Sequence, residues 1–193
     1  MIRRPGPAPT SPPPDRLPPA PGPEPDAPPA GVEVALAVDC DEDVDGPRWT
    51  GLLAAVLADE GAAPGAQAGL SFVAPAAMAE LNAEHLGGTG PTDVLAFPVD
   101  GLGGPGTGPG GPPAVVGDVV ICPAVAAAGA ADHAGTVEDE LALLVVHGAL
   151  HLLGHDHAEA GERATMQGRE RTLLAAHHGP LAADPWAERP GER

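Results

Sequence analysis

Four of the eight histidines in this 193-residue chain fall within one short segment. The segment reads HGALHLLGHDH and contains His147, His151, His155 and His157. His147 and His151 are four residues apart, and in a helix this spacing places both imidazole rings on the same face. Two such rings can bind one metal ion, and Gly154 allows a turn after which a further histidine can complete the site. Zinc accepts three neutral imidazoles and keeps a fourth position for water, which becomes a nucleophile near neutral pH.

Apolar residues surround these histidines. The run from Leu141 to Val146 precedes them, and Leu150 lies between the first two. A helix of this composition is largely buried, and buried imidazoles without partners cost free energy. The pattern therefore predicts a metal site with one zinc ion per chain, rather than a helix that merely carries histidines.

The same spacing occurs in metzincin proteases, whose metal-binding run is HExxHxxGxxH, with one difference. Gly148 stands where those proteases have a glutamate that acts as the general base. Without this proton acceptor, peptide hydrolysis is not expected.

Three motifs together resemble the YbeY family, bacterial zinc-dependent endoribonucleases of ribosomal RNA maturation. The histidine segment is similar to the family's HGxLHLxGxDH. Leu81-Asn82 followed by PTDVLAFP at residues 91–98 resembles the family's LN…PTDVLSFP, and GDVVIC at residues 117–122 resembles its GDIVI(C) strand. The resemblance extends over residues 31–178. It implies an α+β fold in a single domain, with a small mixed four-stranded sheet packed with helices and the metal helix against that sheet.

The resemblance also implies a set of site residues. Carried over position by position, His147, His151 and His157 are the metal ligands. His155 stands where the family usually has tyrosine or another residue, so it is a second choice as a ligand, or a residue that contacts a ligand or the substrate. Asp156 could orient a ligand ring or cap the following helix. No residue is assigned as the general base, and the attacking group is either the zinc-bound water or the ribose 2′-OH of the RNA.

The function implied by the resemblance is single-strand-specific endonuclease action in 16S rRNA 3′-end maturation and ribosome quality control. The expected partners are single-stranded ribosomal RNA and ribosomal proteins or an assembly GTPase. Two alternatives are a non-enzymatic ribosome assembly factor with structural zinc, and a metal hydrolase for another phosphodiester or an ester.

Two positions depart from the family pattern. Leu86 stands near the place where many members have an arginine after the LN motif. His85 is either a replacement for that arginine or, as is more usual, a solvated loop residue. Ala96 replaces the usual serine of the PTDVLSFP motif, which removes a potential hydrogen bond to the substrate.

The charge of the chain conflicts with simple RNA binding. Asp and Glu number 27 against nine arginines and no lysine, for a net charge of −18, and residues 32–178 alone carry about −17. Generic electrostatic nucleic-acid binders need a basic face. A bound metal, a partner protein, or a basic patch of Arg163, Arg169 and Arg171 would relieve the repulsion, although a solvated helix face is the more usual role of such arginines.

Composition divides the chain into three parts. Thirteen of the 26 prolines lie in residues 1–30, which predicts a disordered tail, and a Gly/Pro-rich loop is expected at 101–113. Residues 179–193 are expected to form a loose C-terminal tail. The apolar runs are too short to cross a membrane, and two cysteines are too few for a disulfide scaffold, so the default expectation is a soluble cytoplasmic protein.

Residue periodicity predicts four strands and five helices between the two tails. Thr136 with Asp139 resembles a capping box that begins the histidine helix. His133, His177 and His178 are expected on the surface. Strands are predicted at 32–38, 70–74, 94–97 and 115–122, and helices at 49–61, 76–85, 124–131, 136–154 and 158–177.

Overall fold

The computed structural model describes residues 31–99 and 113–187. The expected tail at 1–30, nearly all of the loop at 101–113 and the last residues, 188–193, lie outside the described residues.

Four strands form one mixed sheet in the order β1-β2-β4-β3. Strands β1 and β2 pair in parallel, as do β2 and β4, whereas β3 runs antiparallel to β4. The expected small mixed four-stranded sheet is therefore confirmed. The strands are β1 (Glu33–Asp39), β2 (Gln67–Val73), β3 (Val94–Pro98) and β4 (Val115–Ile121).

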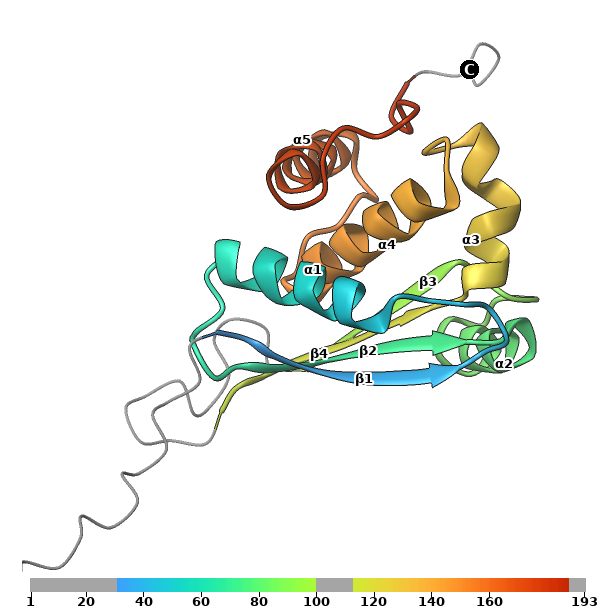
Figure 1. The fold of residues 1–193 in the computed structure, drawn as a ribbon, viewed down its shortest axis with the longest axis horizontal. Helices are drawn as coiled ribbons and strands as arrows, with labels where there is room; N and C mark the ends of the chain where they lie inside the picture. Colours follow the sequence, from blue (N-terminus) through green and yellow to red (C-terminus); the bar gives the residue numbers. More distant parts are fainter. Residues whose placement is uncertain (1–30, 100–112, 188–193) are drawn as a thin grey trace, which may run out of the picture.

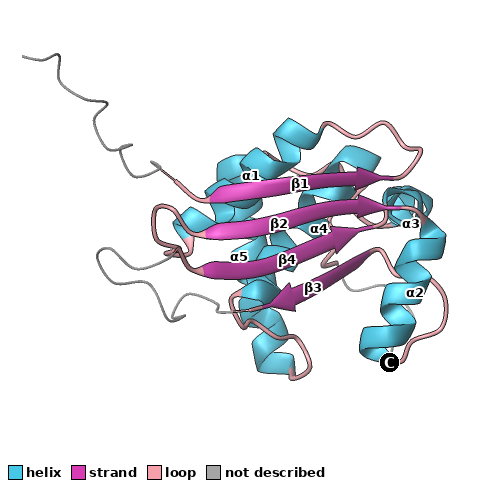
Figure 2. Cartoon of the chain, turned by 90° about the horizontal axis from the view of Figure 1, so that it is seen from below, coloured by secondary structure: helices cyan, strands magenta, loops and turns pink. Residues whose placement is uncertain are grey.

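Helices cover the two faces of the sheet unequally. Helices α1 and α4 lie across one face, and α5 packs on the far side of α4 (Figure 1). Helix α2 lies at one end of the opposite face, and much of that face is open (Figure 2). The helices are α1 (Gly46–Asp59), α2 (Pro75–Leu86), α3 (Pro123–Gly129), α4 (Val137–Leu152) and α5 (Ala160–His177), with a 3₁₀ turn at Ala130–Asp132. The α+β fold expected from the sequence is confirmed.

Local sequence signals account for where the helices begin and end. The Asp45 side chain accepts a hydrogen bond from the Arg48 N–H at 3.2 Å and caps α1. The Thr136 hydroxyl accepts from the Asp139 N–H at 3.1 Å and caps α4, as its spacing predicts. Gly87 ends α2 in the left-handed conformation, which costs glycine little.

The main core lies between the sheet and α4. On β2 the alternate residues Ala68, Leu70 and Phe72 are buried, and α4 is buried along nearly its whole length. Strand β1 is less covered than its alternation suggests, and it is one of the two edge strands of the sheet. Its Leu36 and Val38 are 42% and 50% exposed.

No helix in the described part of the chain has both the length and the apolar character needed to cross a membrane.

Helix α4 approaches strand β4 closely at Gly148. A Cβ atom at this position would lie 2.6 Å from Cγ1 of Val119, well inside van der Waals contact. Gly148 therefore allows the close helix-to-sheet contact, and the position that bears glutamate in metzincins has no room for a side chain here.

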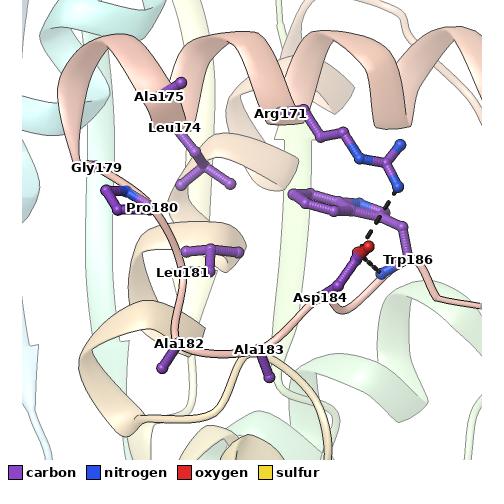
Figure 3. A pocket seen from close by; sticks show the side chains of 10 residues that line it. All are labelled: Arg171, Leu174, Ala175, Gly179, Pro180, Leu181, Ala182, Ala183, Asp184 and Trp186. Carbon is purple, nitrogen blue, oxygen red and sulfur yellow. Dashed lines mark hydrogen bonds and ion pairs between the residues drawn. The ribbon is translucent and has the colours of Figure 1, made fainter.

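The segment after α5 differs from the expected loose tail. Its Leu181 and Trp186 pack against the main core, and the Ala183 N–H donates to the Ala134 carbonyl at 3.0 Å. Figure 3 shows Arg171 and Asp184 beside the Trp186 ring, in the pocket between α5 and this segment. Residues 179–187 lack a helical or strand period, so their anchoring depends on single contacts that sequence periodicity does not reveal.

Asp139 fixes both the start of α4 and the C-terminal segment. One carboxylate oxygen accepts from the Ala182 N–H at 3.1 Å, and the other lies 2.8 Å from His178 Nε2. The His178 side chain is only 7% exposed, contrary to its expected surface position. Partial burial raises the pKa of Asp139, but hydrogen bonds from a histidine, a hydroxyl and a backbone N–H outweigh it and hold the pKa below its usual range.

We expect Gly148→Ala to lower the free energy of unfolding by about 1–3 kcal/mol, because the added methyl group must displace Val119. The matched control is Gly168→Ala in α5, where a Cβ would meet no atom within 4 Å. That change should raise the free energy of unfolding by up to about 1 kcal/mol through helix propensity. Urea denaturation measures both variants, and equal stabilisation of the two would contradict the close packing of α4 on β4.

We expect Asp139→Asn to lower the free energy of unfolding by about 2 kcal/mol at neutral pH, because hydrogen bonds to the charged carboxylate are lost. The lowered pKa means that the carboxylate stabilises the fold above the pKa of the unfolded chain. This stabilisation is lost as the pH falls through the lowered value in the folded state. Urea denaturation across the acidic range should show the two proteins converging. The exposed Asp41 supplies the control Asp41→Asn, and a constant gap between wild type and Asp139→Asn would refute the assignment.

Candidate metal centre

The end of α4 and the turn after it bring three histidines together. His147 and His151 lie on the last two turns of α4, and Gly154 reverses the chain at a φ of 86°. The His155 N–H donates to the Leu150 carbonyl at 3.0 Å and closes the helix end. A positive φ strains residues other than glycine, so Gly154 is what allows the chain to return His157 to the same place.

The three rings converge on one point. Ring nitrogens of His147, His151 and His157 that could bind a metal all lie within 4.8 Å of one another. The two Nε2 atoms of His147 and His151 are 3.1 Å apart, and the ring centroids are separated by 4.6 to 5.3 Å. The residues singled out in the sequence therefore share a single site.

The environment of His151 favours its neutral form. Burial lowers the pKa of this imidazole, and the neighbouring rings of His147 and His157 lower it further. A neutral imidazole has a free lone pair, which is the form that binds a metal.

A buried carboxylate holds the ring of His147. The Nδ1 atom of the His147 ring lies 2.7 Å from Oε1 of Glu170. The Trp186 indole N–H donates to Oε2 of the same carboxylate at 2.6 Å. Burial raises the pKa of Glu170, but these two hydrogen bonds outweigh it, and the pKa is lowered. The ionised carboxylate therefore favours a proton on Nδ1 and leaves Nε2 free to face the other two rings.

Sequence reasoning missed both Glu170 and Trp186. Glu170 lies on the buried face of α5, four residues after Met166 and three before Leu173. An acidic residue on an apolar helical stripe is the signal that could have drawn attention to it. Trp186 offered no such signal, because it lies outside any periodic element.

His155 and Asp156 lie away from the convergence point of the rings. His155 is not part of the group of three, and its Nε2 is 4.0 Å from a carboxylate oxygen of Glu60, the residue that follows α1. Asp156 Oδ1 accepts from the backbone N–H groups of His157 and Ala158 at 2.6 and 3.3 Å. Asp156 therefore stabilises the turn that carries His157.

The two positions that depart from the family pattern lie on α2 and β3. Leu86 is 69% exposed at the end of α2, and the ring of its neighbour His85 makes an edge contact with Phe97, with centroids 4.9 Å apart. Ala96 is half-buried on β3 and packs against the core that contains α4.

Two cavities flank the His147 ring. The first, of about 180 Å³, is lined by His147, His157, Arg163, Met166 and Gln167. The second, of about 220 Å³, includes the carboxylates of Asp93 and Glu170 among its lining residues. The first cavity therefore gives access to His147 and His157, and the second gives access to His147.

The donor set fits a transition metal. Three imidazole nitrogens suit zinc, copper, iron or nickel, whereas magnesium and calcium prefer oxygen ligands. Three protein ligands with one open position are typical of catalytic zinc.

Comparisons with known proteins agree with the motifs. The family model described as Endoribonuclease YbeY matches residues 41–178. The Endoribonuclease YbeY of Rhodococcus erythropolis is 43% identical over 136 residues, which cover 68% of this chain and 74% of that protein. The protein of the same name from Salinispora tropica is 52% identical over 104 residues, 51% of this chain and 66% of that protein. That of Mycolicibacterium vanbaalenii is 47% identical over 114 residues, 58% of this chain and 61% of that protein.

The matched regions span slightly less than two thirds of the Salinispora and Mycolicibacterium proteins. A solution structure of a protein from Thermotoga maritima has the same fold, with a TM-score of 0.51 and 24% identity over 84% of this chain and 99% of that one. The family model covers most of the chain, including the converging histidines, and this chain therefore belongs to the YbeY family.

Proposed function

We propose that this chain is a metal-dependent endoribonuclease that cleaves single-stranded ribosomal RNA. The observation that carries the proposal is the convergence of His147, His151 and His157 within the region matched by the endoribonuclease family model. The finer proposal is zinc as the metal, one ion per chain, and a role in 16S rRNA 3′-end maturation and ribosome quality control in the cytoplasm.

The three histidines would hold the zinc ion through ring nitrogens. When bound, zinc supplies Lewis acidity and an activated water for phosphodiester cleavage. Glu170 keeps the proton of His147 on Nδ1, and Trp186 keeps the Glu170 carboxylate in place. Gly148 bears no side chain, so the helix itself offers no general base at the position that metzincins use.

The number of ligands favours an enzyme over an assembly factor with structural zinc. Structural zinc is almost always held by four protein ligands, whereas the group found among the described residues has three. A hydrolase for another phosphodiester or ester would fit the same ligands, and the family match favours RNA.

The acidic character of the chain favours delivery by a partner. Residues 32–178 carry about −17, which repels a phosphate backbone at long range. We propose that ribosomal proteins or an assembly GTPase bring the chain to its RNA.

We expect zinc-loaded protein to cleave a labelled single-stranded RNA and His151→Ala to lose this cleavage, because one of three ligands is gone. The control is His177→Ala, since the His177 ring binds Asp59 on the outer side of the fold. Equal cleavage by wild type and His151→Ala would reveal a contaminating nuclease. If neither protein cleaves although wild type binds zinc, the assembly-factor alternative gains support.

We expect Glu170→Gln to weaken zinc binding by about 10- to 100-fold, because the amide no longer fixes the proton on His147 Nδ1. Trp186→Phe keeps an aromatic ring but removes the N–H donor, and it should weaken zinc binding less than Glu170→Gln does. Competition with a chromophoric chelator measures both. The exposed Glu84 on α2 supplies the charge-matched control Glu84→Gln, and unchanged zinc affinity in Glu170→Gln would remove Glu170 from the metal centre.

A further inference from the structure

We propose that Arg163 and the cavity that it lines bind a backbone phosphate of the RNA strand beside the metal centre. The proposal rests on the function proposed above and names the residue that positions the strand. The cavity of about 180 Å³ is lined by the histidines His147 and His157 together with Arg163, Met166 and Gln167. A group that enters it therefore meets the ligand rings and the guanidinium at once.

A hydrogen bond to the turn that carries His157 holds the Arg163 side chain in position. Arg163 lies in the first turns of α5, and its Nε donates a hydrogen bond to the His157 carbonyl at 3.3 Å. This bond uses one edge of the guanidinium and leaves its terminal nitrogens for another acceptor. An arginine fork matches the geometry of a phosphate group, to which it can donate two parallel hydrogen bonds.

Arg163 differs from the other arginines of the described region in its partners. Arg48 pairs with Glu138, Arg169 pairs with Glu60, and Arg171 lies 3.7 Å from Asp184. Among the described residues, no carboxylate lies within ion-pair distance of Arg163, although the chain is rich in acids. Its positive charge is therefore free for a ligand, whereas the charges of the other three are already compensated inside the protein.

The two cavities beside His147 differ in charge. The cavity at Arg163 is lined by a cation, an amide, two imidazoles and a methionine. Among the described residues, the second cavity has no arginine in its lining, which includes the acidic residues Asp93 and Glu170 beside His133 and His147. A phosphate is repelled by carboxylates and attracted by a guanidinium, so the strand should pass on the Arg163 side.

The test measures binding of a short fluorescent single-stranded oligoribonucleotide to zinc-loaded full-length protein, on ice and over a range of salt concentrations. The variants are Arg163→Ala, Arg163→Lys and Arg48→Ala. Arg48→Ala removes the same charge near the opposite end of α4, beside Glu138. We expect Arg163→Ala to weaken binding roughly tenfold and to lower the slope of log affinity against log salt by about 0.7. Arg163→Lys should retain part of the affinity, and Arg48→Ala should change both quantities less.

Two further readouts separate this proposal from its alternatives. Zinc affinity should be unchanged in Arg163→Ala, because the Arg163 side chain donates its hydrogen bond to the backbone carbonyl of His157 and not to a histidine ring. In cleavage assays the variant should raise KM more than it lowers kcat.

Each outcome bears on the proposal. If wild type cleaves RNA and Arg163→Ala matches Arg48→Ala in affinity and salt slope, the phosphate site is wrong and the nuclease function stands. If wild type binds the RNA without cleaving it and only the Arg163 variants bind less, the phosphate site stands and the nuclease function fails. If zinc-loaded wild type does not bind the RNA at all, the phosphate site is overturned.

Discussion

The metal centre depends on the close contact between α4 and strand β4 at Gly148. Without a side chain at this position the helix can lie directly on Val119, and the apolar residues on either side fill the core between α1 and the sheet. Because packing on the sheet holds the helix in place, the positions of its last two turns are also fixed. His147 and His151 emerge from these turns, so their separation is set by the core rather than by the metal. The site is in this sense preorganised, which reduces the free-energy cost of assembling it around an ion.

The C-terminal segment extends this support to the other side of the site. Asp139 ties the segment to the start of α4, and Trp186 places its indole N–H on Glu170, which in turn holds His147. A chain of hydrogen bonds therefore links the segment after α5 to the His147 ring. Because Glu170 is buried, an unsatisfied carboxylate oxygen there would be costly, and Trp186 satisfies the one that His147 does not reach.

The sequence predicts the elements of this fold well, since they depend on local periodicity. Each predicted strand and helix corresponds to an observed one, and the capping role of Thr136 is confirmed. The convergence of the three histidines could also be foreseen, because helical spacing and one glycine turn determine it. By contrast, the burial of His178, the anchoring of residues 179–187 and the role of Glu170 depend on contacts between residues distant in sequence. The acidic residue on the apolar stripe of α5 marks Glu170 as unusual, but one sequence alone does not show which distant residues it contacts.

The electrostatics of the chain become easier to understand once the ion pairs are known. Net charge alone argues against RNA binding, but it counts every arginine equally. Arg48, Arg169 and Arg171 are each next to an acidic side chain, so they contribute little to the field that a ligand would meet. The charges that matter at short range are those beside the histidine rings, where Arg163 faces one cavity and two carboxylates face the other. An acidic protein can therefore accept a polyanion at one point, provided that something else overcomes the repulsion at long range. Local attraction combined with long-range repulsion would favour RNA that is already presented by a partner over free RNA in solution, because a presented strand is already held close to the point where the attraction acts.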